Sequence, residues 1–267
     1  MKNILLLNIA LLIVFTSCSE YQKVLKSDDA DYKYKKGLEY LEKKDYLRAS
    51  NLFDAVAIYY KGTEKSEELL YNMAMASLGQ KDYYTAGSYF KKYVKTYPKG
   101  KFVVDSKFMI GLCYYSDSPD ARLDQEATEE AIDAFQEFLE LYPESEKVQL
   151  ATKYLEEMSN KMAQKLTINA RLYFNLGNYL GNNYQSAIIT AQNALRKYPS
   201  STYREQLSMI ILESKYQEAI YSVEEKRLER FRGVVDEYYT FSNEFPDGKL
   251  KKKADKILNE SKKQLKE

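Results

Sequence analysis

An aromatic residue followed by proline recurs four times along the chain. The pairs are Tyr97-Pro98, Tyr142-Pro143, Tyr198-Pro199 and Phe245-Pro246. A residue that precedes proline is driven out of the helical region, so each pair is typical of a helix end. A helix ending that recurs in this way predicts a chain built from copies of one small unit, each covering the apolar face of its neighbour.

One template fits five segments when positions are counted from an anchor residue 24 positions before each proline. It has an aromatic residue at +9, a small residue at +12, a larger residue at +16 and an aromatic residue at +23. The second segment fits well, with the anchor Ala74 followed by Tyr83, Ala86, Phe90 and Tyr97. The other anchors are Gly37, Gly111, Asn175 and Ser222; Lys61 replaces proline in the first segment, and the third has eight extra residues in its turn.

This spacing predicts an antiparallel pair of helices in each segment. Small residues at the anchor and at +12 let the two helices approach closely, and the residue at +16 shares the buried face of +12. Lys44-Asp45 and Lys81-Asp82 predict polar turns in which the aspartate caps the second helix. Each hairpin leaves one apolar face uncovered, and stacking on the next hairpin buries it.

The spacing of small and aromatic residues resembles the tetratricopeptide repeat (TPR). The resemblance covers residues 31–246 and implies an all-α fold, a TPR solenoid of five helical hairpins plus a C-terminal capping helix. The expected hairpins are residues 31–61, 66–98, 101–143, 146–199 and 201–246, and the expected cap is 247–267.

Three stretches depart from a regular repeat. Residues 146–181 contain no proline and reach their first glycine at Gly177, which predicts one long helix or a kinked pair. The enlarged turn from Ser116 to Thr128 is expected to be a solvated loop, with a contact point for a partner as the alternative. The lysine-rich stretch from Lys249 to Lys253 is expected to begin a solvated cap, with a site for an acidic partner or a lipid headgroup as the alternative.

The first residues resemble a bacterial lipoprotein signal. An apolar run from Ile4 to Phe15 follows Lys2 and leads into Thr16-Ser17-Cys18. The run is too short to span a bilayer, which takes roughly 20 residues, and has the length of a secretory signal. The resemblance implies that residues 1–17 are removed, that Cys18 carries lipid and that residues 18–30 form a tether. An ordinary secretory signal with an incidental cysteine is the alternative.

The composition excludes several classes of site. The chain has no histidine and no glycine-rich phosphate loop among its 10 glycines, so histidine-based catalysis and nucleotide cradles are not expected. Removing Lys2 with the signal leaves 39 basic against 39 acidic residues (40 − 1 and 39), which does not favour nucleic acid. We expect no enzyme, no metal and no cofactor besides the covalent lipid on Cys18, although a pair of carboxylates in acid–base catalysis stays open. Cys113 is expected to be a small core residue.

The TPR resemblance also predicts a groove for a peptide. In such arrays the first helix of each hairpin lines the concave face through the positions at −3, +1 and +4 from the anchor. In the first three hairpins these positions are apolar or aromatic, which suits an extended or helical peptide. The alternative is that some of these side chains pack against neighbouring hairpins. The nine residues are Tyr34, Leu38, Leu41, Tyr71, Met75, Leu78, Phe108, Leu112 and Tyr115.

The lipoprotein signal, the 250 residues that follow residue 17, the five hairpins and the long stretch before the fourth together resemble the outer-membrane protein assembly factor BamD family. The resemblance implies a non-enzymatic subunit of the β-barrel assembly machinery, anchored by lipid on the periplasmic face of the outer membrane. Ser19 is compatible with sorting to that membrane.

The BamD resemblance also implies partners. The C-terminal repeats would bind the periplasmic domains of a BamA-like barrel protein, and the N-terminal repeats would bind unfolded outer-membrane barrel precursors. Other assembly lipoproteins are further expected partners. The alternatives are a TPR scaffold for cell-wall or division proteins and a SusD-like ligand-binding lipoprotein, the latter disfavoured because the chain has no tryptophan for stacking on sugars.

Overall fold

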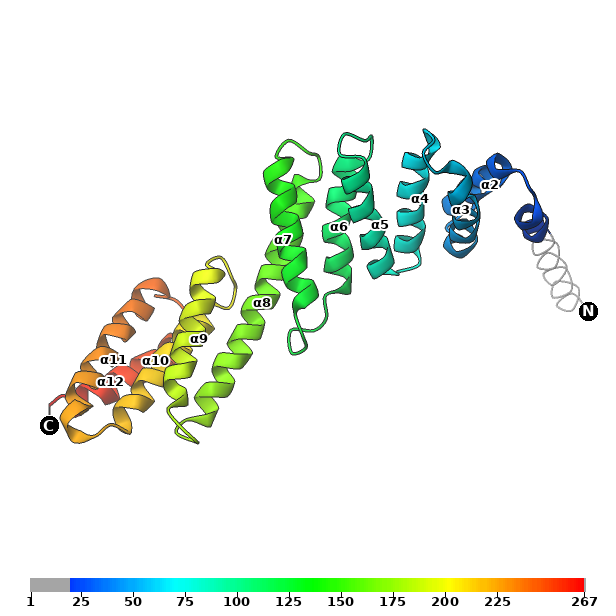
Figure 1. Ribbon diagram of the computed structural model, residues 1–267. Coiled ribbons are helices and arrows are strands. Elements are labelled where there is room, and N and C mark those ends of the chain that lie inside the picture. The colour runs from blue at the N-terminus through cyan, green and yellow to red at the C-terminus, as the bar shows by residue number, and fades with distance from the viewer. Residues whose placement is uncertain (1–19, 267) are drawn as a thin grey trace, which may run out of the picture. The chain divides into compact units, whose positions relative to one another are not determined.

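The structure is a computed structural model that describes residues 20–266. Every regular element in that range is an α-helix, and successive helices pack as antiparallel hairpins (Figure 1). The predicted all-α fold of TPR hairpins is confirmed. The predicted signal at 1–17 and the predicted lipid site at Cys18 lie outside the described residues.

The chain divides into two compact units. Unit 1 holds residues 20–118 and 133–151 of the described range, and unit 2 holds residues 119–132 and 152–266. The helices of unit 1 are α2 (Ala30–Glu42), α3 (Tyr46–Tyr60), α4 (Lys65–Gly79), α5 (Tyr83–Thr96) and α6 (Val103–Asp117). Unit 2 contains α9 (Asn183–Lys197), α10 (Arg204–Ile220), α11 (Glu224–Glu244) and α12 (Lys251–Gln264). Both α7 (Glu126–Leu141) and α8 (Val148–Leu176) have residues in each unit.

The glycine anchors of unit 1 are places of close helix contact, as the template predicts. A Cβ atom added to Gly37 would lie 2.6 Å from Cε1 of Phe53, and one added to Gly111 would lie 2.7 Å from Cε1 of Phe135. Both rings are fully buried. The second helix of each hairpin therefore places an aromatic ring directly on the backbone of the first, which only a very small anchor permits.

The turns of the first two hairpins also match the prediction. The side chain of Asp45 accepts a hydrogen bond from the backbone N–H of Arg48, and Asp82 accepts one from Thr85 at 3.1 Å. The lysine before each aspartate has a positive φ, 60° at Lys44 and 62° at Lys81. This left-handed residue ends the first helix, and the aspartate then starts the second.

The aromatic residues before proline end their helices. Helix α5 stops one residue before Tyr97, α9 one residue before Tyr198 and α11 one residue before Phe245. The backbone N–H of Tyr97 still donates to Tyr93 O at 2.8 Å, which closes the last turn. The predicted helix endings are confirmed at these three positions and also at Tyr142, which directly follows the last residue of α7.

The anchor predicted for the fourth hairpin is wrong. Asn175 is the second-last residue of α8 and is exposed, because Gly177 ends the helix with a φ of 55°. The close helix contact forms earlier, where Ala170 on α8 packs fully buried in one cluster with Ala187 and Ala191 on α9.

The anchor predicted for the fifth hairpin is also wrong. Ser222 lies in the turn between α10 and α11, because α11 begins at Glu224, seven residues before Phe231 (231 − 224). About two additional turns of helix therefore precede the position where the template places the start of this helix. The core of this hairpin instead joins Met209 and Leu212 on α10 to Phe231 on α11.

Helix α8 is a single continuous helix of 29 residues, which decides between the two predictions for this stretch. At 1.5 Å per residue it is about 43 Å long. It ends at Leu176, before the predicted limit of 181, since the turn of residues 177–182 contains two glycines of positive φ, Gly177 and Gly181.

Part of the predicted tether at residues 18–30 is wrong, because residues 20–26 are helical and pack on the first hairpin. Val24 is fully buried and Tyr21 is almost so, in one cluster with Leu52 on α3. The Tyr21 ring also meets Tyr40 edge-on at 5.8 Å, and its hydroxyl accepts a hydrogen bond from Asn51. This short helix covers the outer apolar face that the first hairpin would otherwise expose.

The enlarged third turn is tied to its surroundings by hydrogen bonds within unit 2. The Gln125 side chain donates to the carbonyl oxygens of Asp120 and Leu123, at 2.8 and 3.2 Å. Lys165 on α8 donates to the carbonyl oxygens of Arg122 and Leu123, at 3.1 and 2.8 Å. The Arg122 and Leu123 side chains remain exposed, so the turn is a surface loop fixed at its base.

Candidate functional site

Seven of the nine predicted groove residues are half-buried on the first helices of their hairpins in unit 1, and the other two are buried. Tyr34 is 9% and Phe108 is 3% exposed. Each points toward the second helix of its own hairpin, where Tyr34 contacts Phe53 and Phe108 contacts Phe138. The prediction that these two residues line an open groove is wrong. For the other seven residues the groove stays a prediction. They are Leu38, Leu41, Tyr71, Met75, Leu78, Leu112 and Tyr115.

Tyr71 joins the second hairpin to the third. Its hydroxyl donates to Asp105 at the start of α6, and its ring stacks on Phe102 with centroids 4.2 Å apart. Lys147 pairs with the other oxygen of Asp105 at 2.8 Å. Burial and the neighbouring carboxylate raise the pKa of Tyr71 well above its usual range, so the phenol stays protonated and keeps donating.

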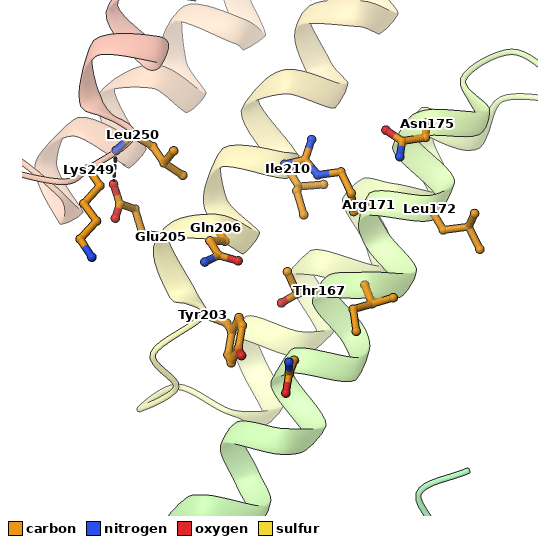
Figure 2. Close-up of a pocket in the computed structure, with 12 residues that line it drawn as sticks. Thr167, Arg171, Leu172, Asn175, Tyr203, Glu205, Gln206, Ile210, Lys249 and Leu250 are labelled. Carbon is orange, nitrogen blue, oxygen red and sulfur yellow. Dashed lines mark hydrogen bonds between the residues drawn. The ribbon is translucent and has the colours of Figure 1, made fainter. Parts of the chain in front are cut away.

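A groove that the sequence analysis missed lies in unit 2. It has a volume of about 670 Å³ and runs between α8 and α10, beside the turn that precedes α12 (Figure 2). The sequence carries a signal for it, because the α8 lining residues recur at helical spacing and mix amide, apolar and basic side chains. The lining is Gln164, Thr167, Ile168, Arg171, Leu172 and Asn175 on α8, Tyr203, Glu205, Gln206 and Ile210 on or just before α10, and Lys249 and Leu250.

A buried carboxylate holds two cations beside this groove. Glu213 on α10 is only 7% exposed, and its Oε2 lies 2.9 Å from Nη1 of Arg171. Lys253 on α12 pairs with the other oxygen. The Arg171 guanidinium also lies over the Phe174 ring at 5.0 Å, and Figure 2 shows it reaching from α8 toward Ile210. These contacts fix the guanidinium in place while 37% of the Arg171 side chain remains exposed.

Glu205 fixes the start of α12 against α10. Its Oε1 accepts a hydrogen bond from the backbone N–H of Leu250 at 2.6 Å, the dashed contact in Figure 2. A Cβ atom on Gly248 would lie 2.4 Å from the same oxygen, so a glycine is needed for this approach. Unit 1 repeats the arrangement, where Glu67 accepts from the backbone N–H of Lys101 at 2.7 Å.

The turns of the two hairpins in unit 2 carry a second exposed surface, named here the turn edge and made of Tyr179, Leu180, Ile220, Tyr221 and Val223. Leu180 is 90% and Tyr221 is 63% exposed. The two turns are neighbours, since the Asn182 side chain donates to Glu218 at 2.6 Å and the Tyr184 ring stacks on Tyr221. Both turns lie at the same end of unit 2 in Figure 1.

No arrangement typical of metal or thiol chemistry was found in the part of the chain that the structure describes. Residues 20–266 contain no group of three or more His, Cys, Asp or Glu side chains that could hold a metal ion. No helix in that range is long and apolar enough to cross a membrane. Cys113 is 3% exposed, and burial raises its pKa to about 12, which confirms it as a core residue.

Comparison with solved structures finds similarity to the structure titled "TPR2AB-domain:pHSP90-complex of yeast Sti1". The match has 13% sequence identity and a TM-score of 0.41, and covers 87% of this chain and 98% of that chain. No curated protein sequence matches the chain significantly.

Comparison with protein families gives a match over most of the chain. The profile described as "YfiO: Outer membrane lipoprotein" matches residues 26–218, which is more than half of the sequence. The matched range includes all of α2 to α9 and most of α10, and therefore both units. The chain belongs to the YfiO family of outer membrane lipoproteins.

Proposed function

We propose that this chain is a non-enzymatic, BamD-like subunit of the β-barrel assembly machinery, held on the periplasmic face of the outer membrane by lipid on Cys18. Its family places it with outer membrane lipoproteins. Its described residues form stacked hairpins, an architecture that offers extended surfaces for other proteins.

This proposal depends mainly on the exposure of the apolar residues of the turn edge. Exposed clusters of apolar side chains often mark interaction sites on proteins. Here Tyr179 and Val223 are 68% and 61% exposed beside the still more exposed Leu180. Aromatic and aliphatic side chains of this kind supply the centre of protein interfaces. The proposed partner is the periplasmic part of a BamA-like barrel protein, docked on the C-terminal hairpins.

Unit 1 has the proposed role of receiving clients. The half-buried residues of the first helices, such as Leu38, Met75 and Leu112, give this unit an apolar surface. An unfolded barrel precursor carries alternating apolar side chains that suit such a surface. Binding of this kind needs no catalytic group.

Attachment by lipid raises the effective concentration of the protein near its partners. Attachment to the same membrane as the partners turns each encounter into one between molecules confined to a surface. A single acyl chain binds a membrane only marginally, so lasting attachment needs more than one chain. The stacked hairpins then present the turn edge to the partner and the surface of unit 1 to the client.

Depletion of the protein from its host tests this function. The expected result is a severalfold fall in folded barrel proteins of the outer membrane, measured by quantitative mass spectrometry of that membrane, while lipoproteins without a barrel keep their levels. Unchanged barrel levels after depletion would contradict the proposal. A division or cell-shape defect with normal barrels would favour the alternative of a scaffold for wall or division proteins.

A further inference from the structure

The groove between α8 and α10 has dimensions that suit a short stretch of extended chain. Gln164 and Asn175 both line it and lie eleven residues apart on α8, roughly 16 Å at 1.5 Å per residue. An extended chain of about five residues covers the same distance at 3.3 Å per residue. The groove is therefore long enough for a peptide segment lying parallel to α8.

Its polar lining matches a peptide backbone. Gln164, Asn175 and Gln206 bring three carboxamide groups to the groove, and none of them hydrogen-bonds to any residue within 20–266. Each carboxamide offers two donors and an acceptor, which is what exposed peptide N–H and C=O groups require. Ile168 and Leu172 lie between them, 38% and 55% exposed, and provide apolar surface for alternate side chains.

The charge of the site selects the occupant. The carboxylate of Glu205 is engaged by the Leu250 N–H, and that of Glu213 by Arg171 and Lys253. The ammonium of Lys249 has no ion-pair partner among the residues described. Counting Arg171, Lys249 and Lys253 against these two carboxylates leaves an excess of one positive charge. Such a site attracts an anionic group and disfavours a basic one.

We propose that the groove between α8 and α10 binds an extended acidic segment of another protein, with about five residues seated. One carboxylate is directed at Lys249 and another at the exposed part of Arg171, which lie on opposite sides of the groove (Figure 2). The proposal deepens the proposed function, since it gives the chemistry of a second contact of the same scaffold. It uses different residues from the turn edge, so the two surfaces serve separate contacts.

A lipid headgroup shares the negative charge of such a segment, but it accounts for less of the site. A headgroup phosphate would accept hydrogen bonds from Lys249, Arg171 and the carboxamide N–H groups. It would offer no row of N–H donors to the three carboxamide oxygens and no alternate side chains to Ile168 and Leu172. Only a peptide would bind the cations, the carboxamides and the apolar residues of the lining together.

The test is selection from a displayed library of random nine-residue peptides against the purified full chain. We expect the enriched peptides to be acidic, with apolar residues between the acidic ones. A synthetic peptide of the enriched sequence, followed by fluorescence anisotropy, should bind the Lys249→Glu variant at least tenfold more weakly. Replacing its acidic residues by lysine should restore binding to that variant.

Two controls make the result decisive. Lys262→Glu makes the same charge change at an exposed position near the other end of α12, and should bind the peptide within twofold of the wild type. Leu172→Asn changes only an exposed apolar contact and should weaken binding without loss of the helical circular dichroism signal.

The proposal is overturned by enrichment of non-acidic peptides, by no enrichment, by Lys249→Glu binding as the wild type does, or by binding of phosphatidylglycerol vesicles with no peptide binding. Since the test uses purified chain, it can fail while the depletion experiment succeeds.

Discussion

Single residues fix the tight turns between the helices of unit 1. Lys81 has a φ of 62°, and Lys44 has the same left-handed conformation in the preceding hairpin. For a residue with a Cβ this conformation costs roughly 1–2 kcal/mol, and glycine adopts it without that cost. Both lysines are exposed, so their side chains contribute no burial to offset it.

Replacing Lys81 by glycine should therefore stabilise the protein. Part of the gain is offset by the greater freedom of glycine in the unfolded chain, so we expect up to about 1 kcal/mol. For a chain of this size, that corresponds to a rise of about 2–4 °C in the melting temperature. Thermal unfolding followed by circular dichroism measures it. Lys81→Ala is the matched control, since it keeps the Cβ and should give no rise; an equal rise in both variants would refute the explanation.

For single residues, the sequence predicts the structural role correctly where that role depends on near neighbours in the chain. The caps Asp45 and Asp82 and the close contacts at Gly37 and Gly111 follow from the residue and its neighbours in the chain. The burial of Phe108 does not, because the direction of that side chain depends on how far the second helix overlaps the first. The expectation of an open groove consequently included residues that belong to the core.

The elements of the last two hairpins depart from the repeat because their helices have different lengths. Gly177 ends α8 early relative to the template, and α11 begins about two turns early. A template counted from the proline keeps its register only across helices of constant length, so it placed Asn175 and Ser222 wrongly. The groove of unit 2 was missed for a related reason, since it depends on α8 and α10 lying together, and their lining residues are far apart in the sequence. The turn edge did leave a signal in the sequence, because Leu180 is an apolar residue in a turn.

The contact between Glu205 and Leu250 should govern how firmly α12 is held. In Glu205→Ala the Leu250 N–H loses its partner, at a cost of about 1–2 kcal/mol that falls on the start of α12. Hydrogen exchange followed by mass spectrometry should show faster exchange across residues 251–264 with α9 unchanged. Glu229→Ala, at an exposed position on α11, should leave α12 as in the wild type. Equal protection of α12 in wild type and Glu205→Ala would refute this role.

Across the whole molecule the excess of tyrosine has a structural explanation. Many of the 26 tyrosines are packed between helices, and several donate to a carboxylate on another helix, as Tyr93 does to Glu67 and Tyr216 does to Glu260. Burial is the main cause that raises the pKa of Tyr34, Tyr93 and Tyr216 to about 12 each. An ordinary tyrosine in the unfolded chain has a pKa of about 10.

This difference predicts loss of stability in alkali. Because the pKa values of these groups are higher in the folded state, the stability they contribute is fully present below pH 10 and is lost as the pH rises toward 12. Circular dichroism at 222 nm and tyrosinate absorbance should show helix loss in that interval. Tyr216→Phe should move the loss to higher pH, whereas Tyr84→Phe, at a position 85% exposed, should not. A helical signal that is constant up to pH 12 would contradict this account.

The proposed function depends most on docking of the turn edge of unit 2 on a barrel protein of the assembly machinery. This docking is measured most directly by affinity purification of the full chain from solubilised envelope, with quantitative mass spectrometry of the recovered proteins. Leu180→Asp combined with Tyr221→Asp should preserve the fold, since both residues are exposed and aspartate tolerates the positive φ of 54° at Leu180. The matched control combines Ile58→Asp with Tyr84→Asp, two residues of unit 1 that are 73% and 85% exposed.

We expect the wild type and the control to recover a barrel protein with periplasmic domains, and the turn-edge variant to recover at least tenfold less of it. Recovery of no such protein by the wild type, or equal recovery by the wild type and the turn-edge variant, would contradict the proposed docking.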